Sequence, residues 1–178
     1  MRLALLLALS LSASTAQAEQ LFKLDGRAAL GPAWRLEETQ RLRLGGELSI
    51  TARIGLQPKS GNELIPVLLP ELGAAAISGD YGSDYYFLGG VGAGLGNDWF
   101  VMGLVPSFLG GSFYDGLGRQ QIGYGGRLLG EIELMRIVGV QAAYNLYVYD
   151  RSPHHEVRVT FSINAFPVII ILLSRGTL

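Results

Sequence analysis

The sequence predicts an all-β fold, a closed antiparallel up-and-down β-barrel of eight strands, and three observations lead to it. Residues 41–57 alternate between polar and apolar side chains without a break, which is the period of a strand with one apolar face. Glycine accounts for 25 of 178 residues, about twice its usual frequency of roughly 7%. Charged residues make up only 16% of the chain, against roughly 25% in ordinary soluble proteins. No apolar run reaches the roughly 20 residues of a membrane-spanning helix. Together these features are typical of a transmembrane barrel.

Residues 1–18 have the pattern of an export signal. Arg2 gives the positive start, Leu3–Leu11 the apolar centre, and Ala16-Gln17-Ala18 the small-residue cleavage pattern. We expect cleavage after Ala18, so that residues 19–178 form a single barrel domain. Arg2 is the only charge removed, which leaves a net charge of −2 and argues against nucleic acid as a partner. The chain has no cysteine, which excludes disulfides, Cys-ligated metals and a lipoprotein anchor.

Eight strands are expected along the mature chain. The first lies near Lys23–Leu30 and the second covers 41–57. Clear alternation returns at 121–135, 138–149 and 156–164, and weaker alternation at 66–78, 85–96 and 100–108. The stretch 66–78 is the weakest because Pro66 and Pro70 each remove a hydrogen-bond donor from the ladder. Eight is the smallest common strand number of outer-membrane barrels.

The connections between these strands fall into two sets. Tight connections are expected at Asn97-Asp98, as a two-residue turn, and at Met135–Ile137, with an intermediate one at Pro58–Glu63. Longer polar connections are expected at 31–40, 78–84, 110–120 and 150–155. Short turns on the periplasmic side and longer loops on the outer side are typical of such barrels.

The charged residues of the polar face are expected to form a structural network that fills the lumen, since eight strands leave an interior just wide enough for side chains. From the connections, Glu131 should lie opposite Gln141, Arg127 opposite Asn145, and Tyr147 near Arg158. A small polar pore or ligand pocket, or proton or ion chemistry, are the alternative roles. The expected lumen residues are Lys23, Asp25, Arg27, Arg41, Arg43, Glu47, Arg53, Arg127, Glu131, Glu133, Glu156 and Arg158.

Alternation alone does not show which face is outside, because a soluble lipocalin-like barrel has the same period. Opposite charges mixed with glycines on the polar face favour a crowded lumen. The apolar face is clean over full strand length and includes aromatic residues suited to a membrane interface. These are Trp34, Tyr85, Trp99, Phe100 and Tyr144.

With its signal, strand number and lumen charges, the chain resembles the small outer-membrane barrels of the OmpA/OmpX type from Glu19 to Ala165. The resemblance implies a Gram-negative outer membrane, contact with its lipid, and insertion by the barrel assembly machinery. Members usually end on an outward-facing aromatic residue. Here Phe166 falls on the lumen face by parity, and Pro167–Leu173 follow.

Two further motifs do not indicate a catalytic, metal-binding or phosphate-binding site. His154 and His155 are the only histidines and are expected in a surface loop; neighbouring strand residues would point to opposite faces, and metal sites need three or four ligands. The spacing of a Ser/His lipid A deacylase is not found. Gly92-Ala93-Gly94-Leu95-Gly96 is followed by no helix, so it does not predict a phosphate-binding loop.

We therefore expect an integral outer-membrane protein with a structural or surface-interaction role, no catalytic residues, no metal and no cofactor. No particular surface ligand is indicated. The alternatives are a narrow solute channel and an exported soluble barrel that binds an apolar ligand, with a membrane-embedded lipid-modifying enzyme as a more distant one.

Overall fold

The computed structural model describes residues 20–36, 42–56, 62–80, 82–97, 99–115, 117–135 and 137–164. The expected signal, Arg41 and the tail from residue 165 lie outside the described residues. The strands are β1 (Gln20–Arg35), β2 (Leu42–Leu56), β3 (Ile65–Gly79), β4 (Gly82–Gly96), β5 (Phe100–Tyr114), β6 (Gln120–Leu134), β7 (Val138–Tyr149) and β8 (Ser152–Asn164).

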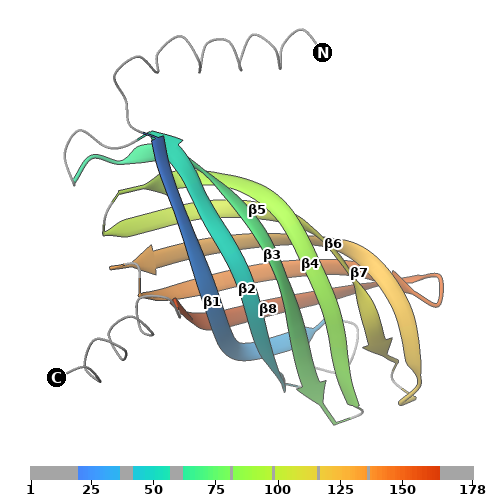
Figure 1. Cartoon of the computed structure of the whole chain (residues 1–178). Helices are drawn as coiled ribbons and strands as arrows, with labels where there is room; N and C mark the ends of the chain where they lie inside the picture. Colours follow the sequence, from blue (N-terminus) through green and yellow to red (C-terminus); the bar gives the residue numbers. More distant parts are fainter. Residues whose placement is uncertain are drawn as a thin grey trace, which may run out of the picture.

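The eight strands form one closed antiparallel barrel in chain order, and β8 pairs with β1 to close it. The predicted strand number, direction and closure are confirmed. The doubtful stretch 66–78 is a full strand, β3, whose register with β4 runs unbroken from Ile65 to Gly79. Figure 1 shows long strands that run obliquely from one end of the barrel to the other.

The closure has a stagger that the backbone register defines. The register can be followed around the barrel by passing from Asp25 on β1 to its partner on β2, and from each partner to the next strand. The path reaches Glu156 on β8, which pairs with Arg35 on β1. The intermediate positions are Thr51, Glu71, Gly90, Ser107, Arg127 and Asn145. One circuit therefore ends ten residues further along β1. With the usual strand spacings, this stagger tilts the strands by about 40°.

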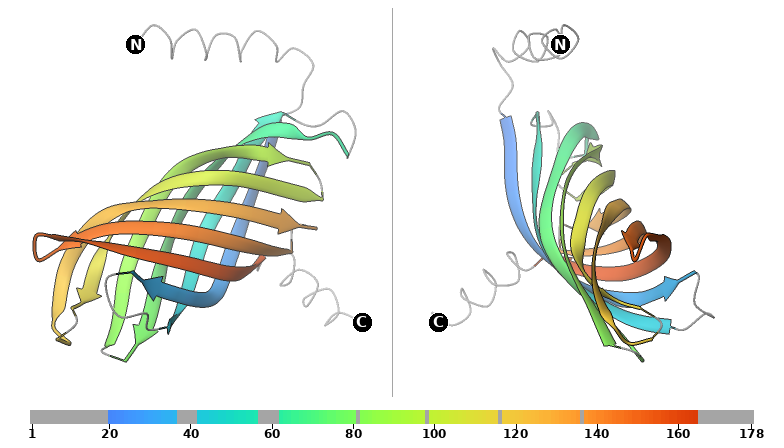
Figure 2. Two further views of the ribbon diagram at one scale, coloured as in Figure 1. Left: turned by 180° about the vertical axis from the view of Figure 1, so that it is seen from behind. Right: turned by 90° about the vertical axis from the view of Figure 1, so that its right-hand side faces the viewer.

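Three prolines inside strands coincide with three gaps in the ladders. The β1–β8 register skips Gly31 and Pro32, the β2–β3 register skips Pro70, and the β4–β5 register skips Pro106. Each proline lacks an N–H and cannot donate to the ladder. Because each gap covers only two residue pairs, the strand continues on its far side. β1 bends in its second half, the part that pairs with β8 from Arg27 to Arg35 (Figures 1 and 2).

Glycines on β4 allow a close approach of β5. A Cβ atom at Gly90, Gly92 or Gly94 would lie 2.1–2.2 Å from a carbonyl oxygen of β5, far inside van der Waals contact. These glycines lie at inward positions of β4, and the neighbouring backbone of β5 occupies the space that their side chains would fill.

The connections are shorter than predicted on one side of the barrel. Asp80-Tyr81 joins β3 to β4, Asp150-Arg151 joins β7 to β8, and residues 115–119 join β5 to β6. The prediction of long loops at 78–84, 110–120 and 150–155 is wrong because the strands extend into them, and β1 likewise continues through residue 35. At the other end, Met135–Ile137 is confirmed, while the β4–β5 connection is Asn97–Trp99, one residue longer than expected. There Asn97 Oδ1 accepts the N–H groups of Trp99 and Phe100.

The two faces of the wall differ in chemistry. Outward positions carry large exposed apolar side chains such as Leu48, Phe87 and Phe161, each more than two-thirds exposed. Inward positions are filled, with Arg158 only 1% exposed. The sequence suggested an interior filled by charged residues. The structure differs, because two apolar clusters occupy part of the interior. One consists of Ala33, Ala75, Ile77, Tyr86, Leu88, Leu109, Phe113, Tyr147 and Tyr149, and the other of Ile65, Val67, Leu69, Val101, Val105, Leu129 and Ala143.

Candidate functional site: the ionic interior

Ten of the twelve charged residues expected in the lumen are buried there, at 0–7% exposure. They are Asp25, Arg27, Arg43, Glu47, Arg53, Arg127, Glu131, Glu133, Glu156 and Arg158. Lys23 is half-buried on β1, and Arg41 lies outside the described residues. Glu131 pairs with Gln141 and Arg127 with Asn145 in the β6–β7 register, as predicted.

The first ionic group lies at the end of the barrel where β1 begins. Arg27 binds Glu131 at 2.5 Å and approaches Glu133 at 3.5 Å, and Arg53 pairs with Glu133 and with Asp25. Asn164 on β8 donates to Asp25 Oδ1 at 2.7 Å, so this group also ties the two strands of the closing seam together. All of these charges have an opposite charge within reach, which a buried charge requires.

The second group is centred on one carboxylate. Glu47 Oε2 accepts Arg127 Nη1 at 2.8 Å and Arg158 Nη1 at 3.1 Å. We call Glu47, Arg127 and Arg158 the Glu47 junction. Arg127 also lies 3.5 Å from Glu71, and Arg158 donates to the Tyr86 hydroxyl at 2.7 Å.

The third group lies towards the opposite end. Asp84 Oδ2 accepts Arg35 Nη2 at 2.8 Å and Arg43 Nη1 at 2.6 Å, while its Oδ1 accepts the Tyr114 N–H at 2.7 Å. Glu156 accepts Asn145 Nδ2 at 2.9 Å and lies 3.5 Å from Arg43. Asn145 also donates to Tyr86 at 3.2 Å, which links this group to the Glu47 junction.

Stacked aromatic rings pack beside the third group. Phe113 stacks on Tyr147 with 4.4 Å between ring centroids, and His154 stacks on Tyr149 at 3.8 Å. Arg35 lies over the rings of Tyr147 and Tyr149 and donates to both hydroxyl groups. Tyr147 and Tyr149 are buried, so this aromatic layer fills the interior at that level.

Sequence reasoning missed Arg35, Glu71 and Asp84, which the structure buries in the interior. Glu71 and Asp84 lie on strands whose other inward side chains include Leu69, Ile77, Tyr86 and Leu88, so no polar face was visible. Arg35 falls within the loop expected at 31–40. The signal that could have found all three was parity, since each continues the inward positions of its strand.

The prediction that Tyr147 lies near Arg158 is wrong. In the register, Tyr147 pairs with His154 and Arg158 pairs with Ala143. The difference follows from the two-residue turn at Asp150-Arg151, where both residues have positive φ of 50° and 59°. The longer loop that was expected would have shifted β8 along β7.

The two histidines lie on β8 rather than in a loop, so that prediction is corrected. They point to opposite faces, as neighbouring strand residues should. His154 stacks on Tyr149 inside, whereas the His155 ring hydrogen-bonds the exposed Tyr144 hydroxyl. Among the described residues, no group of three or more His, Asp or Glu side chains could hold a metal ion.

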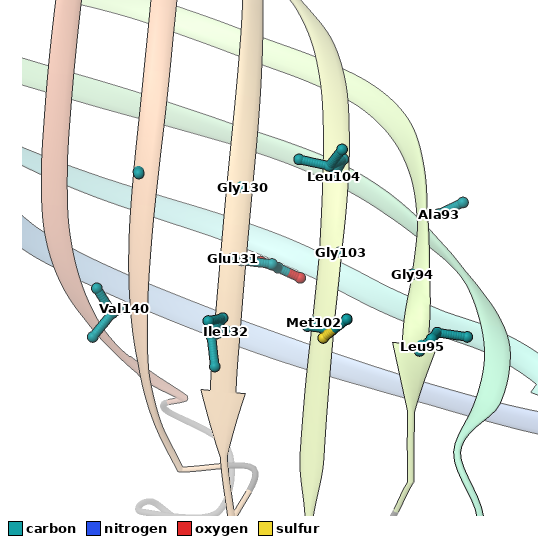
Figure 3. Close-up of a pocket in the computed structure, with 11 residues that line it drawn as sticks. Ala93, Gly94, Leu95, Met102, Gly103, Leu104, Gly130, Glu131, Ile132 and Val140 are labelled. Atoms are coloured by element: carbon teal, nitrogen blue, oxygen red, sulfur yellow. The ribbon is translucent and has the colours of Figure 1, made fainter.

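A shallow hollow of about 460 Å³ lies on the outer wall across β4–β7. Figure 3 shows apolar side chains around it, including Leu104, Ile132 and Val140, while Glu131 points to the far side of the wall. The hollow therefore offers apolar contact and no group for acid–base or nucleophilic chemistry.

The connection between β5 and β6 is organised by Asp115. Its Oδ1 accepts the N–H groups of Leu117 and Arg119, and its Oδ2 accepts the side chains of Arg119 and Gln121. These hydrogen bonds, with that from the Arg119 N–H as the largest contribution, lower the pKa of Asp115 from 3.8 to about 2.

The fold and its interior define a class, the closed eight-stranded antiparallel barrel with an ionic and aromatic interior. Within the described residues, no helix is long and apolar enough to cross a membrane. No family model, curated protein or solved structure matches the chain.

Proposed function

We propose that the protein is an integral outer-membrane β-barrel whose role is structural or interactive, with a lumen closed by its own side chains. The observation that supports this is the distribution of side chains across the wall. Among the described residues, the buried ion pairs lie inside, while the outward positions carry large exposed apolar side chains. A soluble protein rarely exposes apolar patches larger than a few hundred Å², and membrane barrels require an apolar outer band.

The dimensions are consistent with this proposal. A strand of 15 residues, such as β2, tilted by about 40° spans roughly 38 Å along the barrel axis. That length covers the apolar band of roughly 25 Å and both interfaces. Tyr85, Trp99 and Tyr144 are exposed outward, where interfacial aromatics are expected.

The alternative roles have less support. A narrow channel needs an open path, but the ten buried lumen charges are at most 7% exposed. A lipocalin-like carrier needs an apolar cavity and a polar exterior, which is the reverse of this wall. The short connections at Asp80-Tyr81 and Asp150-Arg151 leave little loop for surface recognition, which favours the structural role over the interactive one.

Leu48→Arg tests the membrane assignment. Leu48 is 69% exposed in the middle of β2, so the change should lower the free energy of unfolding from lipid by about 2–4 kcal/mol. In a soluble barrel, the same change at an exposed position would have little effect. The measurement is urea titration of the protein in liposomes. Recovery of the wild-type protein in a periplasmic supernatant without detergent would contradict the proposal.

A further inference from the structure

The first strand of the barrel begins well beyond the end of the last one (Figure 1). β1 pairs with β2 without a gap from Gln20 to Trp34. Its register with the described part of β8 starts only at Arg27, because β8 ends at Asn164. Before Arg27, one edge of β1 therefore extends past its neighbour, and an open strand edge is a template for another strand.

The hydrogen-bonding groups on this edge point away from β2. The Leu36 N–H donates to the His155 carbonyl oxygen on β8, and residues of an antiparallel strand alternate between its two neighbours. The β1–β8 register keeps the same offset on both sides of its gap, so the even-numbered residues of β1 all face the β8 side. Phe22, Leu24 and Gly26 thus present N–H and C=O groups with which no described strand pairs.

The chain beyond Asn164 has the length and composition for this edge. Residues 165–178 lie outside the described residues. Continuing the β1–β8 register into them places Ile171 opposite Gln20, the first residue of β1. Residues 168–173 are all valine, isoleucine or leucine, and Ser174 follows. Val and Ile favour strands, and the apolar run ends about where the edge of β1 ends.

Both faces of such an extension would meet apolar neighbours. By parity, the odd-numbered residues 165–171 would face outward beside Phe22 and Leu24, which are 66% and 50% exposed. The even-numbered residues would face inward, at the end of the barrel where β3 contributes the buried Ile65 and Val67. A polar or charged segment would fit neither face.

Pro167 is compatible with this pairing. It lacks the N–H that its position would donate to β1. Pro32, Pro70 and Pro106 each stand within a strand of this barrel, and in each case the register resumes with the same offset beyond a gap of two residue pairs. Pro167 therefore predicts a fourth gap of the same kind, with pairing that resumes two residues later.

We propose that the segment 165–171 binds along the edge of β1 as a continuation of β8, in the register that β8 already has. The backbones of Phe22 and Ile169 then form two hydrogen bonds, and the Leu24 N–H donates to the Pro167 carbonyl oxygen. The segment occupies the place that a strand of a second molecule would otherwise take. The proposal rests on the barrel geometry and is independent of whether the outer wall faces lipid or water.

Cysteine cross-linking in the full-length chain tests this register. The protein has no cysteine, so a disulfide forms only between introduced residues. Lys23 and Val168 would be opposite each other in a non-hydrogen-bonded pair, with Cα atoms about 4.5 Å apart, inside the disulfide range of about 4.4–6.8 Å. Lys23→Cys/Val168→Cys should therefore form an intramolecular disulfide under mild oxidation, seen as a gel shift that reductant removes.

The matched control is Lys23→Cys/Ile169→Cys, whose two cysteines would point to opposite faces of the sheet. Its disulfide yield should be far lower. Equal yields in the two folded variants, or no disulfide in the first, would overturn the proposal. Disulfide-linked dimers of the first variant in place of the intramolecular product would show that a second copy occupies the edge, which would also overturn it.

A measurement on the folded wild-type protein needs no variant. The closely spaced residues of a non-hydrogen-bonded antiparallel pair bring their Hα atoms together, so a nuclear Overhauser effect is expected between the Hα atoms of Lys23 and Val168. Ala29 and Ser162, which pair in the β1–β8 register, provide the internal reference. A signal for the reference pair without one for Lys23 and Val168 would refute the proposed position of the segment.

Discussion

Asp84 shows how much one inward carboxylate contributes to this barrel. It accepts hydrogen bonds from Arg35, Arg43 and the backbone of Tyr114, and it is 1% exposed. Removing it would leave two guanidinium groups in the interior without their shared acceptor. Such a change is far more costly than the net worth of the ion pairs themselves.

Asp84→Ala should therefore lower the free energy of unfolding by about 3–5 kcal/mol. The neighbouring Ser83→Ala is a suitable control because the Ser83 hydroxyl hydrogen-bonds the Ser78 hydroxyl at an exposed position, and a surface change of this kind costs about 0.5 kcal/mol or less. Urea titration of both variants gives the comparison. Equal stability of Asp84→Ala and Ser83→Ala would show that Arg35 and Arg43 do not need the Asp84 carboxylate.

Acid should release the Asp115 connection at unusually low pH. Because the pKa of Asp115 is lowered to about 2 in the folded chain, its stabilising effect is complete above the unfolded value of 3.8 and is lost as the pH falls towards 2. The amide resonances of Leu117 and Arg119, which donate to Asp115, should shift in that window. Asp115→Asn should abolish the titration; a midpoint near 4 in the wild type would contradict the assignment.

At the scale of the strands, alternation predicted direction, closure and the outward face but not the ends of the strands. Period 2 is a local property, so it located β2 and β6 well. The ends depend on turn geometry, which residues with positive φ such as Asp150 and Arg151 determine. The misplaced Tyr147 follows from that, because one wrong turn shifts a whole register.

Interior charges were predictable where a strand has a continuous polar face, as with Glu47 and Arg53 on β2. They were not predictable on β3 and β4, because apolar clusters fill the barrel there and the pattern is apolar on both faces. Glu71 and Asp84 therefore looked like isolated charges. Which interior region is apolar is a tertiary property that no single strand contains.

The glycine contacts between β4 and β5 can be tested with adjacent residues. In Gly90→Ala, the new Cβ would lie 2.2 Å from the Pro106 carbonyl oxygen, whereas in Gly89→Ala its nearest neighbours would be Leu72 at 3.5 Å and the Glu71 carbonyl oxygen at 3.9 Å, which is ordinary contact. We expect Gly90→Ala to cost about 1–3 kcal/mol through forced backbone shifts and Gly89→Ala to be tolerated. Urea titration measures both; a tolerated Gly90→Ala would mean that the two strands can separate without loss.

At the scale of the whole molecule, the filled interior predicts a barrel whose lumen does not conduct ions. The ionic groups and the aromatic layer occupy the lumen at successive levels between the two ends. Wild-type protein in a planar bilayer should therefore show no steady open conductance steps. Steady steps in repeated preparations would show that the ionic groups separate to form a pore.

The ten-residue offset at the closing seam limits how this sheet can be misassembled. Neighbouring positions on a strand face opposite sides of the sheet. A register shift of one residue between β8 and β1 would therefore place inward residues of one strand beside outward residues of the other. A shift of two residues keeps the arginines inside, but it would separate Asn164 from Asp25. When β8 pairs with β1 to close the barrel, the buried charges therefore favour the native register. A register error must be an even number of residues, and it costs the hydrogen bond between Asn164 and Asp25.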